Sequence, residues 1–200
     1  MMKYLKLFEG YNQFESEIAD ICKEYNIDNF FINPDGLVDV DGDVNLAGRL
    51  DSYNRLHKYI PLKFQNVTGI FDVDDNQLIS LEGSPKMVGG DFNCNNNLLN
   101  DFEGAPHTVD GDFWCYGNTI RSFEGLGNIK GDFYCHHNPI WEIWDIINPI
   151  DNKWNNEKME FFNDLDIIRG EEIAIDRFNF FLEEMGLPTV EKVEGYKNIY

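Results

Sequence analysis

Apolar and polar positions repeat along the middle of the chain, in units that begin at Gly69, Gly90, Gly111 and Gly131. In every unit a Phe, a small apolar residue, an Asn and a Leu or Ile follow the glycine at the same offsets. They are Phe71, Phe92, Phe113 and Phe133; Val73, Cys94, Cys115 and Cys135; Asn76, Asn97, Asn118 and Asn138; Leu78, Leu99, Ile120 and Ile140. The Phe and the small residue stand two places apart, so they point to the same side of a strand. The pattern predicts one short strand per unit.

The units continue with the phrases "SLEGSP", "DFEGAP" and "SFEGLG", and an apolar Val88, Val109 or Ile129 precedes the next glycine. A degenerate first unit, "VDVDGDVNLAGRL", joins the others through "IPLKFQNVTG". Units of this kind bury their apolar residues only against the next unit, so the array needs a cap at each end. We therefore predict an α/β fold with a solenoid of four to five coils, of 20–21 residues each, over residues 36–140.

Residues 1–35 predict an N-terminal capping unit made of one helix and one short strand. Apolar residues at helical spacing predict the helix, and Asn12 with Glu15 resembles a capping box at its start. The apolar positions are Phe14, Ile18, Ile21, Cys22 and Tyr25. The phrase "NFFIN", which is followed by Pro34, Asp35 and Gly36, predicts the strand.

Residues 141–200 predict a C-terminal helical cap over the open end of the array. "IWEIWDII" and "NEKMEFFNDLDII" are typical of short helices. A third helix is expected from one apolar face, which comprises Ala174, Phe178, Phe181, Leu182 and Met185, with stop signals at Gly186 and Pro188. The last residues, "VEKVEGYKNIY", are compatible with a strand or a frayed tail.

The repeated unit resembles the leucine-rich repeat of the short bacterial type, whose pattern L-x-L-x-x-N-x-L is matched here as F-x-V/C-x-x-N-x-L/I. The chain as a whole is similar to a group of leucine-rich-repeat proteins of tailed bacteriophages. That similarity rests on "VDVDGDVNL", the repeated "GDFxC" and "EGxP" phrases, "NPIWEIWDI" and "IDRFNFFLEEMG". It implies a phage-encoded protein in the host cytoplasm, and no activity that can be transferred residue by residue.

The charge of the chain narrows the classes of partner. Acidic residues outnumber basic ones by 36 to 16, and the formal net charge of -20 opposes direct binding to nucleic acids. No apolar run approaches the roughly 20 residues of a membrane-spanning helix, which predicts no membrane partner. A cytoplasmic location also predicts that the four cysteines are free thiols. The sequence predicts no oligomeric state.

No catalytic, metal or cofactor site is expected. The spacing of Cys94, Cys115 and Cys135 is that of the repeat, which places all three at one inward position where Val73 serves equally well. The phrase "DVDGDVN" resembles the start of a calcium loop, but Leu50 stands where the loop would need a Glu. No cysteine follows Cys135, which excludes a cysteine nucleophile in the C-terminal part.

The residues at the outward-facing positions of the strands are the candidate partner-binding residues, and we expect them to form a concave face. They are Asp91 and Asn93; Asp112, Trp114 and Tyr116; Asp132, Tyr134 and His136. Strands stacked about 4.8 Å apart would make Trp114 a neighbour of Tyr134, and Tyr116 a neighbour of His136. Exposed Trp and Tyr are frequent anchors of protein interfaces. Two alternatives are that a cap covers these rings or that they only stack on one another.

The leading hypothesis is a non-enzymatic protein-interaction module that binds a host or phage protein through this face. By analogy with phage accessory proteins, it would inhibit a host defence or redirect a host enzyme. A second hypothesis is an acidic mimic of nucleic acid that blocks a DNA- or RNA-binding protein. A third and weaker one is a small-molecule sponge or hydrolase, with its site between the array and the cap.

Overall fold

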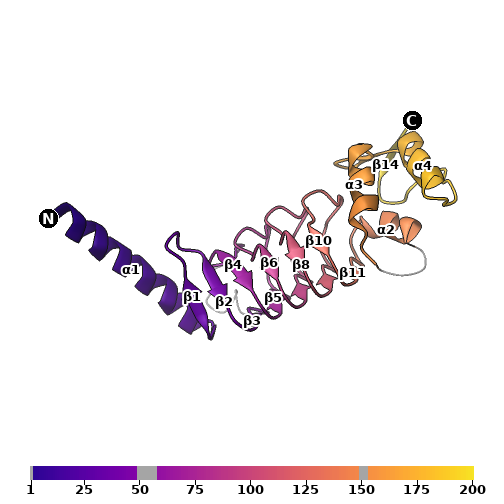
Figure 1. Cartoon of the computed structure of the whole chain (residues 1–200). Helices are drawn as coiled ribbons and strands as arrows, with labels where there is room; N and C mark the ends of the chain where they lie inside the picture. Colours follow the sequence, from indigo (N-terminus) through magenta and orange to yellow (C-terminus); the bar gives the residue numbers. More distant parts are fainter. Residues whose placement is uncertain (1, 49–57, 149–152) are drawn as a thin grey trace.

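The computed structural model describes residues 2–48, 58–148 and 153–200, with side chains from residue 13 onward. The fold is mixed α/β. The strands between residues 30 and 134 lie in a row between one long helix at the N-terminal end and a group of helices at the C-terminal end (Figure 1).

Two sheets run the length of the row, and each repeat contributes one strand to each of them. The first sheet has the order β1 (Phe30–Ile32), β2 (Val38–Val40), β4 (Phe64–Val67), β6 (Met87–Val88), β8 (Thr108–Val109) and β10 (Asn128–Ile129). The second has the order β11 (Phe133–Tyr134), β9 (Phe113–Trp114), β7 (Phe92–Asn93), β5 (Phe71–Asp72) and β3 (Val44–Asn45). All neighbours are parallel except β1 and β2.

The core between the sheets is a column of phenylalanine rings. Phe71 stacks on Phe92 with ring centroids 5.8 Å apart, Phe92 lies 4.9 Å from Phe113, and Phe113 lies 5.9 Å from Phe133. Beside the rings are the side chains of Val73, Cys94, Cys115 and Cys135, all fully buried. The burial predicted for these two positions of the repeat is confirmed.

A column of buried asparagines joins successive repeats. The Nδ2 of Asn118 donates to the carbonyl of Cys115 in its own repeat and to that of Cys94 in the preceding one, both at 3.0 Å. Its Oδ1 accepts from the backbone N–H of Leu99 at 3.0 Å. Asn97 and Asn138 repeat this arrangement. Each amide therefore satisfies backbone groups of two repeats that would otherwise be buried without partners.

Glycine starts each repeat because the backbones approach too closely for a side chain. The N–H of Gly111 donates to the carbonyl of Gly90 at 3.0 Å. A Cβ at Gly111 would lie 2.8 Å from that same carbonyl oxygen, closer than backbone neighbours allow. The repeated glycine is thus explained by close packing of the chain at this corner.

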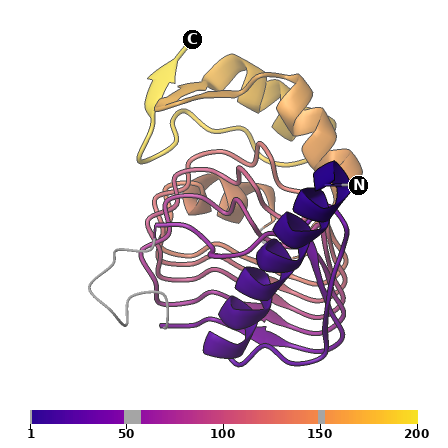
Figure 2. The same cartoon turned by 90° about the vertical axis from the view of Figure 1, so that its left-hand side faces the viewer.

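Helix α1 (Met2–Glu24) is longer than the sequence predicts. Asn12 and Glu15 lie within it, so the predicted start at a capping box is wrong. Ile18 and Cys22 are buried as expected, but Phe14 is 47% exposed and lies beside Gly36. Viewed from its end in Figure 2, the array has α1 running across it. None of the described helices is long and apolar enough to cross a membrane.

The C-terminal part contains a small sheet as well as helices, so the prediction of a purely helical cap is incomplete. Its elements are α2 (Trp141–Ile147), α3 (Asn156–Asp164), β12 (Ile168–Arg169), β13 (Glu172–Ala174), α4 (Ile175–Glu184) and β14 (Lys197–Ile199). β12 and β13 form a hairpin through Gly170, and β14 adds to β13 in parallel. Ala174 therefore belongs to a strand, and Met185 is 37% exposed. The division into three domains stays a prediction.

Aromatic residues pack against one another at the junction between the array and the C-terminal part. Trp144 packs edge-on against Phe133 at 4.9 Å, and Phe162 packs against Phe123 at 5.5 Å. The Tyr196 hydroxyl donates to the carbonyl of Arg121 at 2.6 Å. The apolar core consequently continues from the repeats into the C-terminal helices.

Replacing one asparagine of the column should destabilise the protein strongly. We expect Asn118→Ala to lower the free energy of unfolding by about 3 kcal/mol. The substitution leaves the Leu99 N–H and the carbonyls of Cys94 and Cys115 without the side chain that binds them. Urea unfolding followed by circular dichroism measures the change. Asn100→Ala, at an exposed position of a neighbouring loop, is the control and should change stability by less than about 0.5 kcal/mol. Equal effects of both substitutions would contradict a stabilising role of the column.

Candidate partner-binding face

The outward positions of the second sheet lie on one surface, which we call the ring face. It comprises the eight residues predicted from the sequence together with Trp141 of α2. Asn93, Trp114 and Tyr134 are in register on β7, β9 and β11 and form its central column. All three side chains are partly buried and partly open to solvent.

A row of stacked rings occupies the C-terminal half of the ring face. The rings of Trp114 and Tyr134 lie 3.9 Å apart at an angle of 16°. Tyr134 is 6.4 Å from His136, which in turn lies 4.2 Å from Trp141. The predicted contact between Trp114 and Tyr134 is confirmed, whereas the alternative that the rings only stack on one another stays a prediction. Stacking has left the rings accessible, since each of the four is only partly buried.

Trp141 is the member of the row that sequence reasoning did not include. It lies outside the repeated phrase, at the start of α2, where its backbone N–H donates to the backbone carbonyl of Asn138 at 3.1 Å. The signal that could have found it is its position directly after Ile140, the last residue of the final repeat. At the start of this helix, the indole of Trp141 stacks on the ring of His136.

Two of the predicted aspartates have a role in holding the repeats together. The Oδ1 of Asp91 accepts from the N–H of Asp112 at 2.8 Å, and the Oδ1 of Asp112 accepts from the N–H of Asp132 at 2.8 Å. Asp43 does the same for Ile70 at 2.7 Å. These carboxylates face solvent and also form an interrepeat ladder, which the alternation of letters alone did not predict.

Asp132, the last aspartate of this ladder, binds a lysine where the earlier ones bind a backbone N–H. It forms an ion pair with Lys153 of the C-terminal part, and it accepts a hydrogen bond from the Tyr134 hydroxyl at 3.1 Å. The hydrogen-bonded Lys153 ammonium lowers the pKa of Asp132. Burial, followed by the bond to Asp132, raises the pKa of Tyr134. Lys153, like Trp141, is a residue of the C-terminal part that contacts the ring face.

Tyr116 and Asn95 occupy the outer column differently from the simple alternation. Tyr116 is partly buried. Strict alternation along the strand would also point Asn95 to solvent, and that expectation is wrong, because Asn95 is only 4% exposed. Its Oδ1 accepts from the N–H of Tyr116 at 2.8 Å. The short Asn95 side chain lies next to the backbone of the following repeat, so its amide forms this hydrogen bond and does not extend into solvent.

The N-terminal half of the second sheet is acidic where the C-terminal half is aromatic. Asp72 is in register with Asn93, and Asp74 and Asp75 follow it. Burial is the largest cause of a raised pKa at Asp74, and the charges of Asp72 and Asp75 add to it. One surface therefore presents carboxylates at one end and rings at the other.

The inward cysteines are poor nucleophiles. Cys94, Cys115 and Cys135 are fully buried free thiols. Burial raises the pKa of each of them above that of an ordinary thiol. Since the thiolate is the reactive form, these residues act as packing groups.

In the phrase that resembles a calcium loop, the first carboxylate is engaged by amides. Asp39 accepts from the Nδ2 of Asn33 at 2.7 Å and from the Nδ2 of Asn66 at 2.8 Å. Leu50 lies outside the described residues. Across the described ranges, no three His, Cys, Asp or Glu side chains come together as a metal site.

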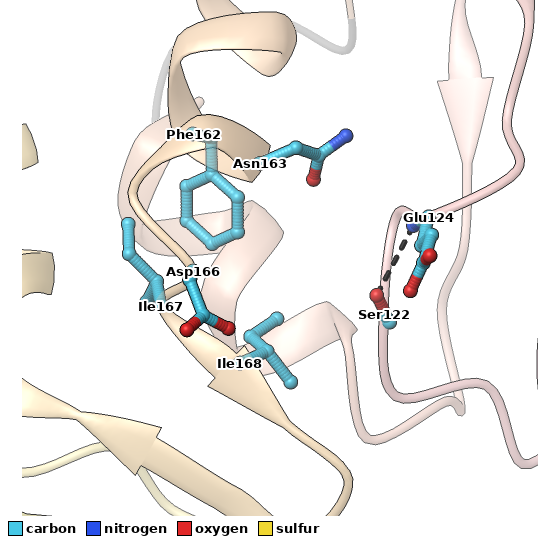
Figure 3. A pocket seen from close by; sticks show the side chains of 7 residues that line it. All are labelled: Ser122, Glu124, Phe162, Asn163, Asp166, Ile167 and Ile168. Carbon is cyan, nitrogen blue, oxygen red and sulfur yellow. Dashed lines mark hydrogen bonds between the residues drawn. The ribbon is translucent and has the colours of Figure 1, made fainter.

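A cavity of about 230 Å³ lies between the last repeats and the C-terminal part (Figure 3). Ser122 and Glu124 line one wall, and Phe162, Asn163, Asp166, Ile167 and Ile168 line the other. The Asp166 carboxylate is bound by Arg169 and Arg177, and the hydrogen bond from Arg169 is the main cause of its lowered pKa. An ionised, paired carboxylate is a poor general acid, and the cavity is smaller than the usual range of ligand pockets.

Comparison of the chain with protein-family models, with curated proteins and with solved structures finds no match. No relative therefore identifies its family or its function, and both are proposed from the chain's own residues.

The four cysteines should resist alkylation in the folded protein. We expect iodoacetamide to modify them at least about a hundredfold more slowly than in concentrated guanidinium chloride, because folding buries the thiols and raises their pKa. Mass spectrometry of timed samples measures the rate for each cysteine. A fast-reacting Cys115 in the native protein would contradict its assignment as a packing residue.

Proposed function

We propose that the chain is a leucine-rich-repeat solenoid of the kind carried by tailed bacteriophages, acting in the host cytoplasm. Support for the solenoid comes from the parallel strands in register at one-repeat spacing and from the buried column of asparagines. Support for the phage family comes from the phrases "GDFxC" and "EGxP" and from the C-terminal motifs. The location follows from that family resemblance.

We further propose that the protein is a non-enzymatic interaction module that binds a host or phage protein through the ring face. The observation that carries this proposal is the row of partly exposed rings, in which Trp114 and Tyr134 are stacked at 3.9 Å. Prestacked rings lose little conformational freedom on binding, so they suit a role as interface anchors. Inhibition of a host defence, or redirection of a host enzyme, is the purpose that phage origin favours.

Removing the anchors should weaken binding to the partner. We expect Trp114→Ala and Tyr134→Ala each to cost about 2 kcal/mol of binding free energy, since buried aromatic anchors commonly contribute that much. A pull-down from host lysates, with and without phage infection, supplies the partner, and calorimetry with the purified partner measures affinity.

Tyr59→Ala is the matched control, because Tyr59 is 55% exposed and is not part of the ring face. The Tyr59→Ala variant should bind the partner with the same affinity as the wild type. Circular dichroism should show that all three variants are folded. Unchanged affinity in both ring variants would overturn the proposed face.

The second candidate function is mimicry of nucleic acid. The acidic end of the second sheet, with Asp72, Asp74 and Asp75, and the net charge of -20 favour it. A mimic would occupy the DNA- or RNA-binding cleft of its partner through carboxylates rather than rings.

Salt dependence and charge removal separate the two candidates. If the protein is a mimic, affinity should fall about tenfold or more between 50 and about 200 mM salt, and Asp72→Asn with Asp75→Asn should weaken binding more than Trp114→Ala does. Competition with a DNA duplex for the partner, followed by fluorescence anisotropy, gives the direct readout. Salt-insensitive binding without competition would exclude mimicry.

A further inference from the structure

The row of rings begins at Trp114, which has a ring neighbour on one face. Tyr134 covers one face of the indole at 3.9 Å, with the rings nearly parallel. Because these residues are in register on adjacent strands, the ring planes lie across the direction from strand to strand. The opposite face of the indole must point toward β7, where the residue in register is Asn93.

Asn93 is too short to cover that face. Its Oδ1 accepts from the N–H of Asn95 at 3.2 Å, which holds the amide close to its own backbone. An indole extends much further from the strand than an asparagine does, so its outer part projects beyond Asn93. The partial exposure of Trp114 agrees with this geometry.

Carboxylates border the open ring face. Asp91 and Asp112 stand two residues before Asn93 and Trp114, and each commits its Oδ1 to a backbone N–H at 2.8 Å. No hydrogen bond to the Oδ2 of either one comes from the described part of the chain. Asp72 lies one strand further on, in register with Asn93. A planar π surface is thus placed beside several negative charges.

The chain itself brings a cation to this column of aspartates. Asp132 holds the position equivalent to Asp91 and Asp112 in the last repeat, and it is paired with Lys153 beside the ring of Tyr134. Lys153 also forms a backbone bridge to Asp132, so an extended segment can lie along this edge and present a cation to the carboxylate. Asp91 and Asp112 hold the same position in their repeats, and their backbone groups are already bonded to neighbouring strands, so each offers only its carboxylate to a cation from another chain.

We propose that the Trp114 end of the ring face, bordered by Asp91 and Asp112, binds an arginine side chain of the partner protein. The guanidinium stacks on the open face of the indole and donates hydrogen bonds to the carboxylates. Arginine fits better than lysine because its planar, weakly hydrated group both stacks and donates in a fork. This assignment rests on the proposed protein-binding function and states the chemistry of its partner.

Three blocked pentapeptides that differ only at the central residue test the assignment. That residue is arginine, lysine or citrulline, and the probes are titrated into the full chain at about 150 mM salt while the indole N–H signals are followed by NMR. We expect the arginine peptide to bind about fivefold more tightly than the lysine peptide and to shift the Trp114 signal most. Citrulline keeps the shape without the charge and should bind at least tenfold more weakly than arginine, about the loss expected with a charge-assisted hydrogen bond.

Two variants and one control identify the groups responsible. Trp114→Ala should abolish the preference for arginine over lysine. Asp91→Asn keeps an Oδ1 that can accept the Asp112 N–H but removes the charge, and it should lower arginine affinity about threefold. Asp101→Asn is matched in charge and in its own backbone bond to Glu103, but lies outside the ring face, and it should leave the affinity unchanged.

Equal binding of the arginine and lysine peptides, or a preference that survives Trp114→Ala, overturns the arginine assignment. If the arginine assignment fails but binding of a partner protein still depends on Tyr134, the proposed protein-binding function stands without an arginine site. An arginine preference that requires Trp114, found together with a partner indifferent to Tyr134, supports the arginine site and overturns the wider ring-face proposal.

Discussion

The structure depends on one constraint, which is that each repeat must satisfy the buried polar groups of its neighbour. The asparagine column meets it at one corner, where Asn118 bonds to Cys94, Cys115 and Leu99. The aspartate ladder meets it at another, where Asp91 accepts from the N–H of Asp112. The asparagine amides supply buried bonds that water cannot replace, and the aspartates add partly buried ones, so every repeat is held at the same register.

That register creates the ring face. Parallel strands at fixed spacing carry equivalent side chains at nearly the spacing of stacked rings, so a Trp and a Tyr at one position of adjacent repeats stack without adjustment. The same geometry lines up carboxylates where the repeats carry Asp. A repeat array of this kind builds its surface one column at a time, so a change of one residue in each repeat changes the chemistry of a whole column.

The C-terminal part finishes the array and also shapes its surface. Trp144 packs on Phe133 in the core, while Trp141, one turn earlier on the same helix, extends the row of rings outside it. Lys153 pairs with the last aspartate of the ladder. At this end, therefore, the residues that close the core stand next to those that complete the ring face.

The sequence by itself determined the interior of the repeats: the burial of Phe113 and Cys115 follows from a period that no loop would maintain. It also placed Trp114 beside Tyr134, since residues one period apart must share a column. Only the tertiary structure decided the rest, which includes the extent of α1, the C-terminal sheet and the stacking of Trp141 on His136. The reason is physical: a repeat carries its own contact pattern in its spacing, whereas the ends of the array touch segments that share no period with it.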